Sequence, residues 1–139
     1  MKKFEDQQYP LSNLTEKLIK ISFDVFNQLG YGLPERVYQK AFAVELTRHH
    51  LEFKRECYGK IDFNGVIVGK YFIDFLVEDK VAVELKVRNE IYQTHINQLL
   101  NYIKAQNLAV GLLLAFSKGG VKIKRLVNTI CVNQRDRSA

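Results

Sequence analysis

The chain has 139 residues, of which 47% are hydrophobic and 12% aromatic, and its formal net charge is +6. This length and apolar content fit one domain with a real core and exclude a disordered chain. The longest apolar run, residues 109–116, is too short to cross a bilayer, and the polar N-terminus has no signal-peptide core. We therefore expect a cytoplasmic protein without a membrane-spanning segment.

The two cysteines, Cys57 and Cys131, lack the paired spacing of a zinc or redox motif, so we expect reduced thiols. Basic residues gather in two segments, residues 48–60 and 118–137. A basic surface attracts polyanions, so the charge indicates nucleic acid as a partner. The alternative is a surface charge that only keeps the protein in solution.

Apolar residues recur at helical spacing from Leu14 to Leu29 and predict a first helix, which ends at the glycines of residues 30–32. Pro34 suits the first turn of a second helix, expected to run to about His50. The apolar stripe predicted for this second helix consists of Val37, Ala41, Val44 and Leu46, with Tyr38 and Phe42 beside it.

From Phe53 onward the pattern predicts strands. Asn64-Gly65 is typical of a two-residue hairpin turn, and a second turn at residues 78–80 leads into a strand at residues 81–87. Further along, the pattern predicts a polar helix at residues 92–106, a buried strand at 108–116, an edge strand at 121–127 and a polar tail at 128–139. The whole chain, 1–139, is then a single domain with its core at about 14–127.

The second turn sets which residues face each other. If it is a three-residue loop, Val77 lies opposite Val81 and Asp74 lies opposite Glu84. A two-residue loop would place Asp74 against Val83 instead. A pairing of the two carboxylates therefore requires the odd loop.

Both acids interrupt strands that otherwise consist of buried residue types. By alternation Glu84 and Lys86 share a face with Ala82. A carboxylate in such a position is costly unless it is paired or bound to a cation. For the preceding strand, alternation predicts that Asp74 shares its face with Phe72 and Leu76, and that Ile73, Phe75 and Val77 occupy the other.

These residue types fit a metal site for hydrolysis. Mg²⁺ takes oxygen ligands, and we expect Asp74, Glu84 and the backbone carbonyl of Leu85 to supply them. Lys86 could orient the attacking water or offset charge developing on a phosphate. The sequence contains no GxSxG elbow, P-loop or GxGxxG motif, so phosphodiester hydrolysis fits best.

The predicted polar helix adds a further set of residues. His95, Gln98 and Tyr102 fall at i, i+3 and i+7, hence on one helix face. Asp74, Glu84-x-Lys86 and Gln98-x-x-x-Tyr102 together resemble the PD-(D/E)XK nuclease superfamily, in particular its RecB-like branch. Residues 32–38 read G-x-x-E-x-x-Y, which is similar to the motif that names a small bacterial family, GxxExxY. The resemblance covers residues 14–127.

The resemblance implies an α/β (α+β) fold: a restriction-endonuclease-like αβββαβ core with a mixed central sheet flanked by helices, here with an extra C-terminal edge strand. It implies Mg²⁺ or Mn²⁺ as cofactor and Lys86 as the catalytic lysine. It also implies Glu35 as an acid at the metal, reached directly or through water, beside Asp74 and Glu84. The residues implied for substrate binding are Tyr38, His95, Gln98 and Tyr102.

One residue departs from the superfamily's pattern. Ile73 stands where the superfamily's name has proline, which removes no ligand. Glu45 is a second acidic candidate on the predicted second helix, but it lies roughly 15 Å along the helix axis from Glu35. We therefore rank Glu45 lower, with pairing to a basic neighbour as the alternative.

The sequence thus predicts a metal-dependent nuclease that acts on DNA in preference to RNA. The alternative is a non-catalytic nucleic-acid-binding or regulatory module on the same scaffold, and a third option is another metal-dependent hydrolase. The oligomeric state stays open, although the terminal edge strand or the first helix could form a homodimer.

Overall fold

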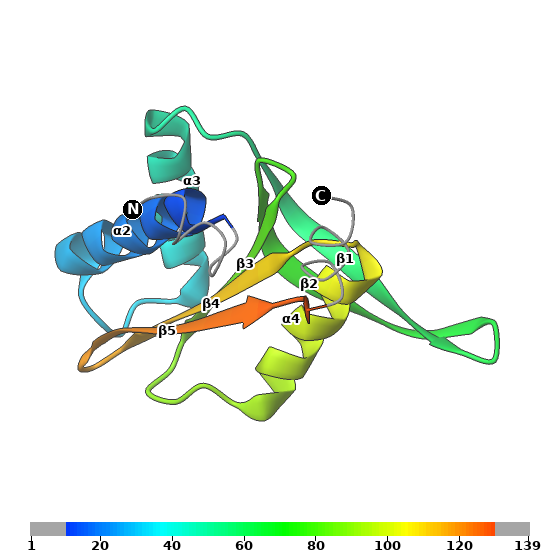
Figure 1. Ribbon diagram of the computed structural model, residues 1–139. Coiled ribbons are helices and arrows are strands. Elements are labelled where there is room, and N and C mark those ends of the chain that lie inside the picture. Colours follow the sequence, from blue (N-terminus) through cyan, green and yellow to red (C-terminus); the bar gives the residue numbers. More distant parts are fainter. Residues whose placement is uncertain (1–10, 130–139) are drawn as a thin grey trace.

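A five-stranded mixed sheet with helices on both faces organises the chain in the computed structural model, which describes residues 11–129 (Figure 1). The strand order is β1-β2-β3-β4-β5, and only β3 and β4 run parallel among the described strands. This confirms the predicted αβββαβ core with an additional edge strand. The elements are α2 (Ser12–Leu29), α3 (Glu35–Arg48), β1 (Phe53–Phe63), β2 (Val66–Val77), β3 (Val81–Val87), α4 (Gln93–Ala105), β4 (Val110–Ser117) and β5 (Gly120–Val127).

Two apolar clusters hold the helices to opposite faces of the sheet. Helices α2 and α3 pack on Val83, Leu112 and their neighbours, whereas α4 packs on Ala82 and Leu113. Because both faces of β4 are covered, its apolar run is continuous rather than alternating, as is typical of strands buried on two sides. Within the described residues, no helix is long and apolar enough to cross a membrane.

The buried stripe of α3 differs from the predicted one. Tyr38, Phe42 and Leu46 face the core, while Val44 is 58% exposed. These three residues recur every four positions, so they follow one helix face as closely as the predicted set did. The aromatic residues hold this face of α3 against the sheet. Tyr38 stacks on Phe116 of β4 with ring centroids 4.6 Å apart.

The turn between β2 and β3 is the odd loop that the carboxylate pairing requires. Val77 lies opposite Val81, and Lys80 donates its N–H to the Val77 carbonyl at 2.9 Å. Glu78 and Asp79 adopt left-handed backbone angles, which make the tight turn possible. The register prediction is therefore confirmed for this hairpin.

The hairpin of β1 and β2 extends far on both sides of its turn, with strands of 11 and 12 residues. Asn64 and Gly65 form the predicted two-residue turn, with Phe63 opposite Val66. Residues 58–72, here called the arm, extend this hairpin away from the helices α2 and α3 (Figure 1). The arm leaves several large apolar side chains in solvent: Tyr58, Ile61, Phe63, Val66, Ile67, Val68 and Phe72.

The alternation predicted along β2 fails at Asp74. Phe75 packs in the cluster beneath α2 and α3, but Ile73 packs in the cluster beneath α4. Glu56 lies between the ladder pairs that flank Asp74 and has a left-handed φ of 54°. A residue in this conformation does not continue the pleat, so the hairpin changes its buried face there. Ile73 and Phe75 therefore do not share a face.

The polar tail also begins later than predicted. Asn128 is buried, and its backbone N–H donates to the Ala109 carbonyl at 2.8 Å. Its side-chain amide donates to the Ile103 carbonyl at 3.4 Å, which joins the end of β5 to α4. Cys57 is a free, half-buried thiol, as predicted; the prediction for Cys131 lies outside the described residues.

Candidate active site

The predicted site lies where the sheet forks. Strands β2 and β3 pair over only three positions, ending at Phe75 and Val83. Beyond that point β2 remains paired with β1, and β3 remains paired with β4. Extending the register by one residue brings Asp74 opposite Glu84. The two carboxyl groups therefore stand at the first position after the fork.

Asp74 accepts hydrogen bonds from a backbone donor of β3 and from a side chain of α3. Its Oδ2 accepts the backbone N–H of Leu85 at 2.8 Å, a donor that β2 would satisfy in a continued ladder. Its Oδ1 accepts the side-chain amide of Gln39 at 3.0 Å. Gln39 was not among the predicted residues, although it lies four positions after Glu35 and so on the same side of α3.

Glu84 is buried against Asp74 and holds its proton tightly. Its side chain is hydrogen-bonded to that of Asp74, and the residue is only 5% exposed. Burial, together with the hydrogen bond and charge of Asp74, raises the pKa of Glu84 to about 10. The charge of Lys86 lowers this pKa and that of Glu35 raises it. The two carboxyl groups thus share one proton in the absence of a cation.

This donor set fits a hard divalent cation. Two carboxyl groups held together despite their repulsion are stabilised either by a proton or by a metal ion. Glu35 influences Glu84 through its charge, yet among residues 11–129 no three His, Cys, Asp or Glu side chains form a metal-binding group. In this conformation Asp74 and Glu84 are the two carboxyl groups in contact, and their role as metal ligands stays a prediction. The roles of Glu35 and of the Leu85 carbonyl stay predictions.

Lys86 and His95 lie on the α4 side of the pair. Lys86 is half-buried two residues after Glu84. Burial lowers the pKa of His95, and the nearby charges of Lys86 and Arg88 lower it further. His95 Nδ1 is buried and has no hydrogen-bond partner within the described part of the chain. The first turn of α4 therefore brings a neutral imidazole close to the lysine predicted to be catalytic.

Tyr38 is a structural residue, contrary to the prediction that it contacts substrate. It is fully buried, and its hydroxyl donates to the Gly30 carbonyl at 2.5 Å and accepts the Leu33 N–H at 3.4 Å. These bonds hold the loop between α2 and α3, whose Gly32 has a φ of 106°. The tyrosine of the GxxExxY motif thus shapes the loop that precedes Glu35.

Replacing Tyr38 by phenylalanine should lower the free energy of unfolding by about 1 kcal/mol, because the half-buried Gly30 carbonyl loses its hydrogen-bond partner. Denaturant unfolding monitored by circular dichroism measures this loss. Tyr31→Phe is the matched control, since Tyr31 is exposed on the same loop. Equal stability of the two variants would contradict the structural role of Tyr38.

The two remaining residues of the predicted α4 face have different surroundings. Gln98 is exposed, and its role in substrate binding stays a prediction. Tyr102 is only 4% exposed, and burial together with the neighbouring Cys57 raises its pKa to about 12. Tyr102 as a substrate contact is therefore wrong, because the helix turns its hydroxyl beneath α4 toward β1.

Glu45 lies outside the site, as its lower rank suggested. Its carboxylate pairs with Arg48 at 2.9 Å and with His49 at 3.8 Å. This is the pairing with basic neighbours that was the alternative to a ligand role. Glu45 therefore serves the C-terminal end of α3, where a basic side chain also complements the helix dipole.

Two cavities lie near the sheet, and one of them is lined in part by Glu35. A cleft of about 750 Å³ extends along the α2–α3 loop and the β3–α4 loop; its lining residues are Tyr31, Leu33, Glu35, Val87, Arg88, Asn89, Glu90 and Tyr92. Within it Arg88 stacks on Tyr92, with Cζ 4.8 Å from the ring centroid. Of the predicted site residues, Glu35 lines this cleft, and Val87 beside it follows Lys86 in β3.

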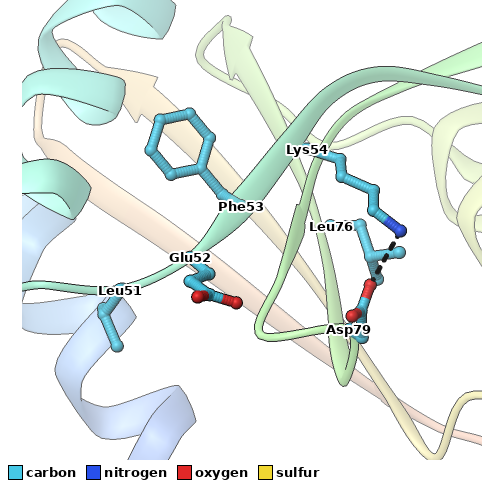
Figure 2. A pocket seen from close by; sticks show the side chains of 6 residues that line it. All are labelled: Leu51, Glu52, Phe53, Lys54, Leu76 and Asp79. Carbon is cyan, nitrogen blue, oxygen red and sulfur yellow. Dashed lines mark ion pairs between the residues drawn. The ribbon is translucent and has the colours of Figure 1, made fainter.

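The second cavity lies apart from the predicted residues. It measures about 330 Å³ and includes Phe53 and Leu76, with Lys54 and Asp79 forming an ion pair of 3.1 Å at its side (Figure 2). The strand start at Phe53 and the β2–β3 turn form its walls. It contains none of the predicted catalytic residues.

Comparison with known proteins agrees with this fold. A family model described as the PD-(D/E)XK nuclease superfamily matches residues 12–126, and the chain belongs to this superfamily. A solved structure titled "Crystal structure of SSO0001" is similar, with a TM-score of 0.52 and 14% sequence identity over 94% of this chain and 68% of that one. At that identity the likeness shows the fold alone. A search of curated proteins gave no match.

Proposed function

We propose that this protein is a divalent-metal-dependent nuclease that hydrolyses phosphodiester bonds, with DNA preferred to RNA. The observation that carries this proposal is the Asp74–Glu84 carboxyl pair at the fork of the sheet. A structural hairpin has no need of a buried carboxyl group in contact with a half-buried one, because their repulsion and desolvation oppose folding. Superfamily membership and the net charge of +6 support a polyanionic substrate.

Each side chain of the site has a role in this proposal. Asp74 and Glu84 would hold Mg²⁺ or Mn²⁺, and the chemistry that this cation supplies when bound is Lewis-acid stabilisation of charge on a phosphate. Gln39 and the Leu85 N–H orient the Asp74 carboxylate. Lys86 offsets the negative charge that develops during hydrolysis, or orients the attacking water.

Finer assignments belong to the same proposal. The G-x-x-E-x-x-Y motif at residues 32–38 supports placement in the GxxExxY group and in the RecB-like branch. Isolated cysteines, one of them described as a free thiol, support a cytoplasmic location. Gln98 and His95 are candidate substrate contacts on α4, where the His95 ring lies 5.7 Å from that of Tyr92 at the cleft.

A second candidate function is nucleic-acid binding without hydrolysis. The observation in its favour is that Glu35 does not join Asp74 and Glu84 in a metal-binding group among the described residues. Binding with strong salt dependence, but without cleavage at millimolar Mg²⁺ or Mn²⁺, would select this alternative.

Cleavage assays on single-stranded, double-stranded and branched DNA and on RNA test the proposal. We expect cleavage with Mg²⁺ or Mn²⁺ and none in EDTA. Asp74→Asn should abolish it, since the amide keeps an acceptor for Leu85 but loses the charge. Asp79→Asn is the matched control, because Asp79 is exposed in the β2–β3 turn. Metal-independent cleavage, or full activity of Asp74→Asn, would reject the mechanism.

A further inference from the structure

The arm presents a face that the fold does not use. Tyr71 and Ile73 of β2 pack in the cluster beneath α4. Because side chains alternate along a strand, their neighbours Lys70 and Phe72 project to the opposite face. Phe72 is 61% exposed there, which is unusual for a phenylalanine in a strand.

Strand β1 contributes matching residues to this face. Tyr58 lies opposite Phe72, and Lys60 lies opposite Lys70. The rings of Tyr58 and Phe72 have centroids 6.3 Å apart, and Lys70 Nζ lies 5.5 Å from the Tyr58 ring centroid. We call Tyr58, Lys60, Lys70 and Phe72 the aromatic–lysine face. Two exposed rings thus stand beside two positive charges.

The charge of this face favours a polyanion over a second copy of the chain. Neither Lys60 nor Lys70 forms an ion pair with another residue of the 11–129 segment. A two-fold dimer through this face would bring the same lysines of both copies together, and like charges repel. A nucleic-acid strand supplies phosphates for the lysines and base faces for the rings.

The face also adjoins the candidate active site. Phe72 precedes Asp74 by two residues on β2, which is about 7 Å at the rise of a strand. A nucleic-acid strand with a phosphate at the Asp74–Glu84 pair is long enough to cross the open end of the fork and reach the Phe72 ring. Unpaired bases can stack on aromatic rings, whereas the bases of a duplex already stack on one another.

We propose that the aromatic–lysine face binds a single-stranded segment of the nucleic-acid substrate, with a base stacked on Phe72 and phosphates beside Lys60 and Lys70. This inference rests on the proposed nuclease function and specifies its substrate. It assigns to the arm a role in positioning the strand that enters or leaves the fork.

Fluorescence anisotropy with a labelled single strand and a labelled duplex, both in EDTA, tests this binding without cleavage. Phe72→Ala should weaken single-strand binding about 10-fold and leave duplex binding nearly unchanged, whereas Phe72→Tyr should bind as the wild type does. Lys70→Ala should reduce the slope of log K against log salt by about 0.7. Phe63→Ala is the control, because Phe63 is equally exposed on the other face of the arm.

The outcomes separate this inference from the nuclease proposal. If cleavage depends on Asp74 but Phe72→Ala binds single strands as the wild type does, the role of the aromatic–lysine face is overturned. The nuclease proposal then stands. If Phe72→Ala weakens single-strand binding but no metal supports cleavage, the nuclease proposal is overturned. The role of the aromatic–lysine face then stands. Equal losses in Phe72→Ala and Phe63→Ala, or a shift from dimer to monomer in sedimentation of Phe72→Ala, also overturn the inference.

Discussion

Replacing Lys86 by alanine is expected to lower the rate of metal-dependent cleavage by about 100- to 1,000-fold, the usual effect of removing one group that stabilises transition-state charge. The physical reason is position: the charge of Lys86 acts on both Glu84 and His95, so the ammonium group lies at the site. Single-turnover cleavage with saturating Mg²⁺ measures the effect, and thermal melting checks that the fold is retained.

Lys80→Ala is the matched control for this experiment. Lys80 is exposed in the turn that precedes the same strand, and the change removes the same charge from the same hairpin. We expect Lys80→Ala to cleave at the wild-type rate. Equal rates for Lys86→Ala and Lys80→Ala would show that Lys86 contributes only to the general positive charge. Lys86→Arg should recover part of the activity, because it retains the charge.

Metal-free stability should fall as the pH rises, and Glu84→Gln should remove most of this dependence. Folded Glu84 keeps its proton well above the ordinary glutamate pKa of 4.5, so unfolding releases a proton between that value and about 10. The contribution is fully present below pH 4.5 and is lost as the pH rises toward the folded pKa. We expect the wild type to lose at least about 1 kcal/mol between pH 5 and pH 8, measured by denaturant unfolding in EDTA.

Metal binding provides an independent measure of the same proton. Since a cation needs the deprotonated pair, Mn²⁺ should bind more tightly at higher pH and release a proton. Calorimetric titrations in two buffers of different ionisation enthalpy would detect that proton. Glu45→Gln is the control, because its carboxylate pairs with Arg48 away from the site. A pH dependence in Glu84→Gln equal to that of the wild type would contradict the assignment to Glu84.

Local signals predicted the elements and the register well. The Asn64-Gly65 turn and the loop at residues 78–80 determine which strand positions face each other, because loop length sets hairpin register. The alternation in β3 correctly placed Val83 and Leu85 on one face, which α2 and α3 cover in the structure. Asp74 and Glu84 could be recognised as candidate site residues from the sequence, because buried strands seldom carry unpaired acids.

Residues on helices were harder to assign. Tyr38 and Tyr102 were expected at the substrate, yet both are buried and serve the core. A helix face inferred from spacing has no absolute orientation until its packing partner is known. Gln39 was missed because its partner, Asp74, lies 35 positions further along the chain. The arm's exposed rings were likewise invisible, since alternation in a strand does not reveal whether a helix covers it.

By itself the sequence determined the order of elements and the identity of two acids and a lysine in adjacent strands, because periodicity and turn chemistry are local properties. Only the tertiary structure decided that β2 and β3 separate at Asp74 and Glu84, that burial keeps Glu84 protonated, and that Glu35 stands further off. These features depend on the packing of segments distant in sequence. The change of buried face at Asp74 and the exposed aromatic–lysine face of the arm also depend on this packing.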